Sequence, residues 1–306
     1  MTFVLSVPAQ TLADDLADLT DRIEIVEWRM DSPAPRARID IVVPPYMNAG
    51  KIFPLLDGLE TGLVQGQSIG YEGISDALPA GHRFANASSV HETSTAELAV
   101  ALTLAVQRHL PGFVRAQDEG EWTSVFAESL ADRRVLLVGY GGIGKAVAAR
   151  LAPFEVTLRA VASRARVEDG MPVHAVSELP ELLPETDIVI LSLPGGEETR
   201  HIVDDAFLSA LPDGALIVNV GRGPLIDTDA LVRHAEAGRI RAGLDVTDPE
   251  PLPSDHPLWS APGILISPHV GGASTAMRPR IAALVRRQVE RMLAGEEPVN
   301  VVVDKR

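Results

Sequence analysis

The feature that most constrains this sequence is a glycine-rich stretch near its middle, Val135–Gly144, which reads VLLVGYGGIG. The apolar run Val135–Val138 has the length of a buried parallel strand. Gly139, Gly141 and Gly144 follow with G-x-G-x-x-G spacing, and an alanine-rich segment without proline comes next. Strand, glycine turn and helix in this order bring backbone amides and a helix dipole to a pyrophosphate. The stretch therefore predicts dinucleotide binding, with a sharp turn that binds no ligand as the alternative interpretation.

Length and composition limit the class of protein. A chain of 306 residues exceeds the usual size of one hydrophobic core, so two domains are expected. The net charge of −15 argues against a nucleic-acid or membrane-surface partner, because phosphates would be repelled. The absence of cysteine excludes disulfides and thiolate zinc sites, and no metal site is predicted. There is no apolar run of about 20 residues and no basic leader, so a cytoplasmic protein is expected.

Alternating strand and helix signals predict two α/β domains. The N-terminal part should form a small parallel sheet with strands at 2–8, 24–30, 38–43 and 63–69 and helices at 12–19 and 51–57. From Val135 onward, one doubly wound sheet should contain strands at 135–138, 156–162, 187–193, 215–220, 240–246 and 264–268. The predicted fold class is a Rossmann-type doubly wound parallel sheet with a smaller flavodoxin-like α/β domain.

Two long helices are expected to connect the domains. Ser94–Glu97 is interpreted as a capping box that opens a helix apolar on nearly every face, which Pro111–Gly112 ends. Such a helix should be buried on all sides, and the following segment 115–132 should wrap an interface. A last helix at 275–293 should return Val299–Val303 to the first domain. The expected domains are therefore 1–93 with 285–306 for the substrate and 94–284 for the dinucleotide.

Polar and charged residues follow three of the predicted strands in the second half. They are Asn219–Gly223, Asp245 with Glu250, and Ser267–His269. Ligands of open α/β sheets collect beyond the carboxyl ends of the strands, so these residues should converge near the glycine loop. A guanidinium can clamp a carboxylate with two parallel hydrogen bonds. A histidine beside a carboxylate can protonate a carbonyl oxygen as hydride arrives at the carbon.

These motifs resemble the D-isomer-specific 2-hydroxyacid dehydrogenases, which include D-lactate, D-glycerate, glyoxylate/hydroxypyruvate and phosphoglycerate dehydrogenases. The similarity covers almost the whole chain. It is most specific in the glycine loop and in later motifs that follow the family order. The later motifs are Leu191–Pro194 with Glu198–Arg200, Val218–Gly223, Leu244–Val246, Glu250–Leu252 and Ser267–His269.

The resemblance implies a role for each motif residue. It makes His269 the acid/base, Glu250 its partner, Arg222 the clamp for the substrate carboxylate, and Asp245 a contact to the nicotinamide. The substrate-binding loop it implies, which holds the carboxylate through backbone amides, is Gln67, Ser68, Ile69 and Gly70. The cofactor-binding residues it implies are Gly139, Gly141, Gly142, Ile143, Gly144, Leu193, Pro194, Val220, Gly221, Arg222, Asp245, His269 and Gly271, and Ser163 and Arg164 are expected beside them at the cofactor's ribose. Family members are usually homodimers with the active site in the cleft between domains, so a homodimer is expected.

The sequence departs from the family pattern at the cofactor's ribose. Members that prefer NAD place an acidic residue about 20 residues beyond the first glycine. Here Ser163 stands at that point and Arg164 and Arg166 follow, which predicts a preference for NADP(H), with NAD(H) also accepted as the alternative. The loop 66–71 carries no basic residue, which disfavours a phosphorylated substrate.

The sequence therefore predicts a reductase that converts a small 2-keto acid, such as glyoxylate or hydroxypyruvate, into the D-2-hydroxy acid. The other histidines, including His82 and His91, are interpreted as ordinary surface or core residues. One alternative is another oxidoreductase on this scaffold, acting on phosphite or formate. The other is a binding protein that senses nicotinamide nucleotides. Glu250 disfavours formate oxidation, because formate-oxidising relatives have glutamine there.

Overall fold

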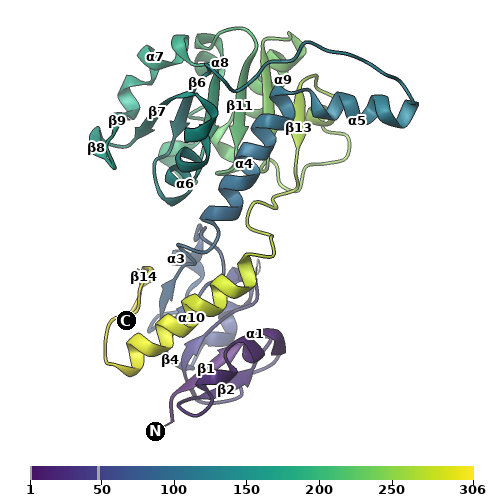
Figure 1. Cartoon of the computed structure of the whole chain (residues 1–306). Helices are drawn as coiled ribbons and strands as arrows, with labels where there is room; N and C mark the ends of the chain where they lie inside the picture. Colours follow the sequence, from purple (N-terminus) through teal and green to yellow (C-terminus); the bar gives the residue numbers. More distant parts are fainter. Residues whose placement is uncertain (1, 47–48) are drawn as a thin grey trace. The chain divides into compact units, whose positions relative to one another are not determined.

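A computed structural model describes residues 2–46 and 49–306, which divide into two compact units. Residues 92–272 form one unit, and the N-terminal segment up to His91 forms the other together with residues 273–306. The expected boundary at residue 285 differs from this division, because it falls inside helix α10 (Met277–Leu293). The whole helix packs with the N-terminal unit (Figure 1), since Ile281, Val285 and Val289 are buried in that unit's core.

The N-terminal unit is built on a six-stranded sheet within the described residues, with the order β14-β5-β4-β3-β1-β2. The expected return of the C-terminal segment is confirmed, because β14 pairs antiparallel with β5 and all other pairs are parallel. The strands are β1 (Val4–Val7), β2 (Glu24–Glu27), β3 (Arg38–Val42), β4 (Glu60–Gln65), β5 (Arg83–Ala85) and β14 (Val301–Asp304). The helices are α1 (Gln10–Asp15), α2 (Ala49–Ile52), α3 (Ile74–Ala77) and α10, with 3-10 turns at Ala17–Leu19 and Phe53–Leu56.

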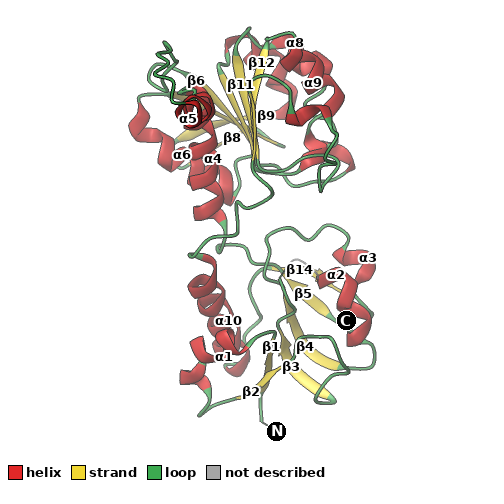
Figure 2. Ribbon diagram, turned by 90° about the vertical axis from the view of Figure 1, so that its right-hand side faces the viewer, coloured by secondary structure: helices red, strands yellow, loops and turns green. Residues whose placement is uncertain are grey.

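Both faces of this sheet are covered. Figure 2 shows α1 and α10 on one side and α2 and α3 on the other. Alternation along β3 serves the two cores, because Ile41 packs with the α1 and α10 side while its neighbour Val42 packs with the α2 and α3 side. The expected strand at 63–69 is too long: β4 ends at Gln65, and residues 66–70 form a loop.

The second unit has an eight-stranded sheet in the part of the chain described, ordered β13-β12-β11-β10-β6-β7-β9-β8. All pairs are parallel except β8 with β9. The strands are β6 (Arg134–Val138), β7 (Thr157–Ala162), β8 (Arg166–Glu168), β9 (Met171–Ala175), β10 (Ile188–Leu191), β11 (Ala215–Asn219), β12 (Ile240–Leu244) and β13 (Ile264–Ile266). The helices are α4 (Glu92–Gln107), α5 (Leu110–Glu119), α6 (Gly142–Leu151), α7 (Leu179–Leu182), α8 (Asp205–Ala210) and α9 (Thr228–Glu236), and short 3-10 turns lie between them.

This sheet is doubly wound, as predicted. Leu136 and Val138 point into a core with α7, α8 and α9, whereas Val135 and Leu137 point into a core with α4 and α6. Figure 2 shows the two helix layers on opposite sides of the strands. The strand order reverses at β6, where β7 lies on one side and β10 on the other. Ligands of such sheets bind at this switch point, beyond the carboxyl ends of the strands.

Three features expected of the first long helix differ from the structure. Helix α4 begins at Glu92 rather than after Ser94–Glu97, because Ser94 and Thr95 are buried helical residues and not caps. This chain alone does not bury α4 on all sides, since Glu97 and Ala101 are exposed. Pro111 and Gly112 do not end it: α4 stops at Gln107, and Pro111 opens α5, where a first-turn proline costs no hydrogen bond.

The hairpin of β8 and β9 was not predicted. Its turn, Asp169–Gly170, has positive φ at both residues (52° and 77°), which is the geometry of a two-residue hairpin turn. The Asp-Gly dipeptide signals such a turn in the sequence. The strand before it, Arg166–Glu168, is too short and polar to be recognised as a strand from the sequence alone.

Candidate active site

The glycine loop leaves β6 at Val138 and enters α6 at Gly142. Gly139 has φ 106°, and a Cβ there would lie 2.9 Å from the Ser192 carbonyl carbon. A Cβ on Gly144 would lie 2.1 Å from the Gly139 oxygen, so the helix can approach the loop only without a side chain. A Cβ on Gly141 would meet nothing within 4 Å among the described residues. Space therefore opens at the glycine whose backbone faces a pyrophosphate in such motifs, so the loop fits the expected cofactor.

Ser163 and Arg164 lie exposed just beyond β7, next to the β8–β9 hairpin. Arg166 of β8 donates to the Tyr140 carbonyl of the glycine loop (3.4 Å) and pairs with Glu168 (2.6 Å). Glu168 also pairs with Lys145 in the first turn of α6. These hydrogen bonds, from Lys145 and then Arg166, lower the pKa of Glu168. The ionised Glu168 thus ties the hairpin to the start of α6, just after the glycine loop, a contact that the sequence interpretation missed.

His269 follows β13, and Glu250 lies in the loop after β12. The Nδ1 of His269 lies 2.5 Å from the Glu250 Oε1. Because a carboxylate is an acceptor, Nδ1 carries a hydrogen and Nε2 is left for a reacting group. Both side chains are more than one third exposed, so the imidazole is accessible. The predicted acid/base and its partner are therefore hydrogen-bonded.

Asp245 holds the loop that carries His269. The residue is 3% exposed, and its carboxylate accepts hydrogen bonds from Ser267 Oγ (2.6 Å), Val270 N (2.9 Å) and Gly271 N (2.8 Å). Its carbonyl accepts from His269 N (2.8 Å). His269 has φ 53°, a left-handed conformation that these contacts on both sides hold in place. The resemblance implied a nicotinamide contact for Asp245, and the structure gives its carboxylate this positioning role, with Ser267 as a partner not foreseen.

Arg222 lies in the loop after β11, which Asn219 shapes. The Asn219 amide donates to the Arg222 carbonyl (2.8 Å) and accepts from Gly221 N (3.0 Å). A Cβ on Gly221 would lie 2.7 Å from the Leu193 oxygen, and one on Gly223 would lie 1.9 Å from the Thr247 oxygen. The missing side chains therefore let the loops after β10, β11 and β12 pack directly together. Pro194 and buried Val220 lie in these same loops.

The candidate substrate loop, Gln67–Gly70, belongs to the N-terminal unit. Its first three carbonyls accept hydrogen bonds from His91 Nε2, Ala87 N and Asn86 Nδ2, respectively. Among residues 2–46 and 49–306, the backbone N–H groups of the loop donate to no acceptor. Partly exposed amides of this kind can receive a carboxylate. Arg83 of the same unit supplies no cation to this loop, because it is buried and bonded to Gly62 and Glu297.

A doubly wound sheet with an open glycine loop and an acid/base pair at its strand ends defines a dinucleotide-dependent α/β enzyme. Residues 100–271 match the family model of the D-isomer specific 2-hydroxyacid dehydrogenase, NAD binding domain. The chain therefore belongs to the D-isomer-specific 2-hydroxyacid dehydrogenase family. It is an oxidoreductase that acts on CH–OH groups with a nicotinamide cofactor.

Similar proteins cover most of the chain. A glyoxylate reductase of Thermofilum pendens is 32% identical, covering 77% of this chain and 73% of its own length. The human glyoxylate reductase/hydroxypyruvate reductase is 29% identical, with 89% of each covered. A D-isomer specific 2-hydroxyacid dehydrogenase from Xanthobacter autotrophicus Py2, solved with NADPH and MES, is 26% identical with a TM-score of 0.83, covering 100% of this chain and 99% of that one. In the described part of the chain, no helix is long and apolar enough to cross a bilayer.

Proposed function

We propose that this protein reduces the carbonyl of a small 2-keto acid, of the glyoxylate or hydroxypyruvate kind, to the D-2-hydroxy acid. The observation that carries the proposal is the 2.5 Å pair of His269 and Glu250, held at the strand ends where the glycine loop also lies. The reductases of Thermofilum pendens and human, named for glyoxylate and hydroxypyruvate, support the substrate class.

His269 is the proton donor in this proposal. A bound nicotinamide supplies the hydride that goes to the carbonyl carbon. The Nε2–H of His269 protonates the carbonyl oxygen, so that one hydride and one proton together give the hydroxyl group. Glu250 accepts the hydrogen bond from Nδ1–H and so keeps Nε2 directed away from itself, toward the reacting group. Asp245 keeps the His269 loop in the geometry that this transfer needs.

Each unit offers groups for a substrate carboxylate: Arg222 in one, and the amides of the Gln67–Gly70 loop in the other. A guanidinium is a planar fork that pairs with both oxygens of a carboxylate. The loop amides add neutral donors, which suit one negative charge better than the extra charge of a phosphate.

NADPH is the preferred cofactor in this proposal. Ser163 replaces the carboxylate that would repel a 2′-phosphate, and Arg164 and Arg166 can pair with it. Glu168 is the nearby acid, and its charge is matched by Lys145 and Arg166. The NADPH in the Xanthobacter autotrophicus structure supports this assignment.

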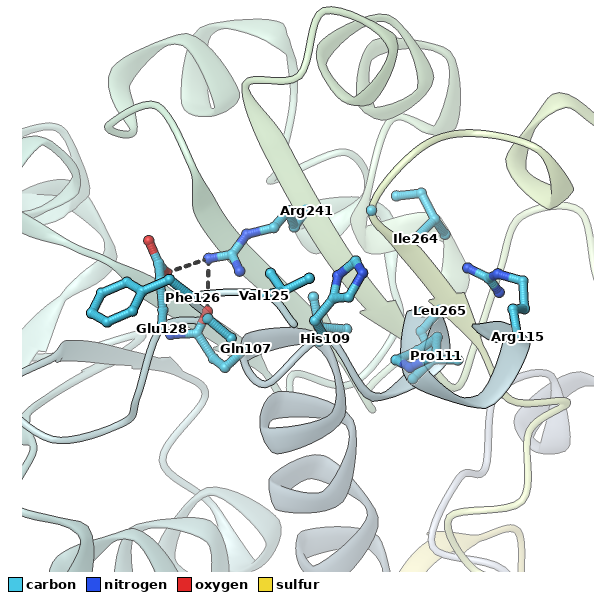
Figure 3. Close-up of a pocket in the computed structure, with 14 residues that line it drawn as sticks. Gln107, His109, Pro111, Arg115, Val125, Phe126, Glu128, Arg241, Ile264 and Leu265 are labelled. Carbon is cyan, nitrogen blue, oxygen red and sulfur yellow. Dashed lines mark hydrogen bonds and ion pairs between the residues drawn. The ribbon is translucent and has the colours of Figure 1, made fainter. Parts of the chain in front are cut away.

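A homodimer formed through the α5 region is also proposed. Trp122 and Phe126, on the segment that follows α5, are fully exposed (101% and 106%). This segment borders a pocket of about 330 Å³ lined by Val106, Pro111, Ile264 and other residues shown in Figure 3. Val125 and Phe126 of this segment line the pocket themselves, so a twofold arrangement that pairs the two segments also covers the two pockets.

Dimer dissociation tests that surface. Burying each aromatic side chain contributes about 1.5–3 kcal/mol, so Trp122→Ser with Phe126→Ser should give monomers in sedimentation experiments. Trp259→Ser, at a half-exposed tryptophan elsewhere in the unit, is the matched control and should leave the dimer intact. A double variant that sediments like the unmodified protein would exclude this interface.

Turnover tests the proposed function directly. Glyoxylate, hydroxypyruvate, pyruvate and bulkier keto acids are each mixed with NADPH, and absorbance is followed. Glyoxylate or hydroxypyruvate should give the highest kcat/KM. Cofactor binding without turnover of any keto acid would instead support a nucleotide-sensing protein.

A further inference from the structure

The Gln67–Gly70 loop is backed by one short segment of its own unit, Asn86–His91. The Ser68 carbonyl accepts from Ala87 N (2.9 Å), and the Ile69 carbonyl accepts from Asn86 Nδ2 (2.8 Å). The Gln67 carbonyl lies 2.6 Å from His91 Nε2. Three consecutive carbonyls are therefore held toward the same segment.

This backing fixes where the amides of the loop point. In a trans peptide the C=O of one residue and the N–H of the next point in opposite directions. Holding the carbonyls of Gln67, Ser68 and Ile69 therefore directs the N–H groups of Ser68, Ile69 and Gly70 away from the backing segment. Those N–H groups donate to no acceptor within the described residues, which is the arrangement that an anion needs.

His91 is the side chain that orders the first of these peptides. It is 4% exposed, and its ring stacks on Tyr46 with centroids 5.9 Å apart and an interplanar angle of 29°. A carbonyl can only accept, so Nε2 must carry a hydrogen in this contact. The Gln67 side chain is fixed as well, because its Nε2 donates to the Pro44 carbonyl (2.8 Å).

We propose that His91 is a positioning residue for substrate binding. It holds the Gln67–Ser68 peptide so that the Ser68 N–H faces the carboxylate of the keto acid. It acts through the loop and does not touch the reacting atoms. This inference rests on the proposed reduction of keto acids, and it assigns a function to a histidine that sequence reasoning placed among ordinary residues.

The test compares His91→Phe with His91→Gln. Phenylalanine keeps a ring against Tyr46 and removes the donor, so KM for the best keto acid should rise about tenfold, the value of one well-oriented hydrogen bond to a charged group. The KM for NADPH should stay unchanged, and kcat should change less than KM, as for a loss of ground-state binding. Glutamine can again donate to the Gln67 carbonyl and should restore most of the KM.

His82→Phe is the matched control. His82 is a histidine of the same unit with 3% exposure, and its Nε2 also bonds to a backbone carbonyl, that of Leu56 (3.1 Å). Its loss should lower the melting temperature without changing the keto-acid KM. If His91→Phe behaves in the same way, with a keto-acid KM within twofold of the unmodified protein, His91 is merely structural and the inference is wrong.

A measurement on the unmodified protein covers the case in which His91→Phe does not fold. Nitrogen-15 NMR of labelled histidine reports which ring nitrogen carries the hydrogen. An Nε2–H His91 is expected at neutral pH, and an Nδ1–H His91 would overturn the inference. Failure of the proposed function would look different, because the unmodified protein would then reduce no keto acid.

Discussion

Replacing Asp245 with asparagine should show whether this residue positions His269 for catalysis in addition to stabilising the fold. Two backbone N–H groups, of Val270 and Gly271, approach different oxygens of the Asp245 carboxylate. Whichever way an asparagine amide turns, its NH2 group faces one of these N–H donors. The variant therefore loses one charge-assisted hydrogen bond outright and weakens the others, at a cost of roughly 3–5 kcal/mol.

Part of that cost should appear as lost activity. Misplacing a catalytic group by about 1 Å can cost about 100-fold in rate, so kcat/KM for the keto acid should fall by about that factor. The melting temperature should fall by roughly 10 °C. The assay is NADPH oxidation, together with thermal unfolding followed by circular dichroism.

Asp187→Asn provides the control. Asp187 precedes β10 and accepts hydrogen bonds from the backbone N–H (2.8 Å) and the guanidinium of Arg134, away from the strand ends of the active site. The Asp187→Asn variant should lose about as much stability as Asp245→Asn and keep the kcat/KM of the unmodified protein. Equal losses of activity in the two variants, or full activity in Asp245→Asn, would refute the positioning argument.

Three further predictions concern cofactor, substrate and pH. Ser163→Asp with Arg164→Ala should reverse a preference for NADPH over NADH, because a charge-assisted hydrogen bond is worth ~1.5–3 kcal/mol; higher kcat/KM for NADH in the unmodified enzyme would contradict it. Hydroxypyruvate should give a higher kcat/KM than phosphohydroxypyruvate, since the loop 66–71 has no cation for a phosphate, and the reverse order in the same assay would show that one arrives from elsewhere. Burial lowers the pKa of His82, so the folded protein binds fewer protons there than the unfolded chain. The stability that neutral His82 contributes should be fully present above the unfolded pKa of about 6.5 and be lost as pH falls through the lower folded pKa. In denaturant titrations, His82→Gln should therefore make the free energy of unfolding depend less on pH. An unchanged pH profile in this variant would show that other groups cause the loss of stability.

The parts of the fold that the sequence predicted are those with strong local signals. The strand Val135–Val138 is a continuous apolar run, and the face of α10 that carries Ile281, Val285 and Val289 has clear helical spacing. Helix α4 was misjudged because Ser94 and Thr95 have the residue types of a cap, whereas tertiary packing buries them inside the helix.

The missed features depend on contacts between distant residues. Strand β8 is short and polar, and the pairs that Glu168 forms with Lys145 and Arg166 tie it to the glycine loop. The Asp245 contacts join the loops after β12 and β13, and the His91 contact spans 24 residues. No local pattern in the sequence marks such hydrogen bonds, so these positioning roles became visible only in the folded chain.

The central claim is that His269 donates the proton in keto-acid reduction, and turnover by His269→Gln tests it most directly. With the best keto acid and saturating NADPH, kcat should fall by about 10²–10⁴-fold, the usual value of general acid catalysis. The Kd for NADPH, measured by fluorescence, should stay close to that of the unmodified protein. Near-normal turnover by a folded His269→Gln protein would contradict the account.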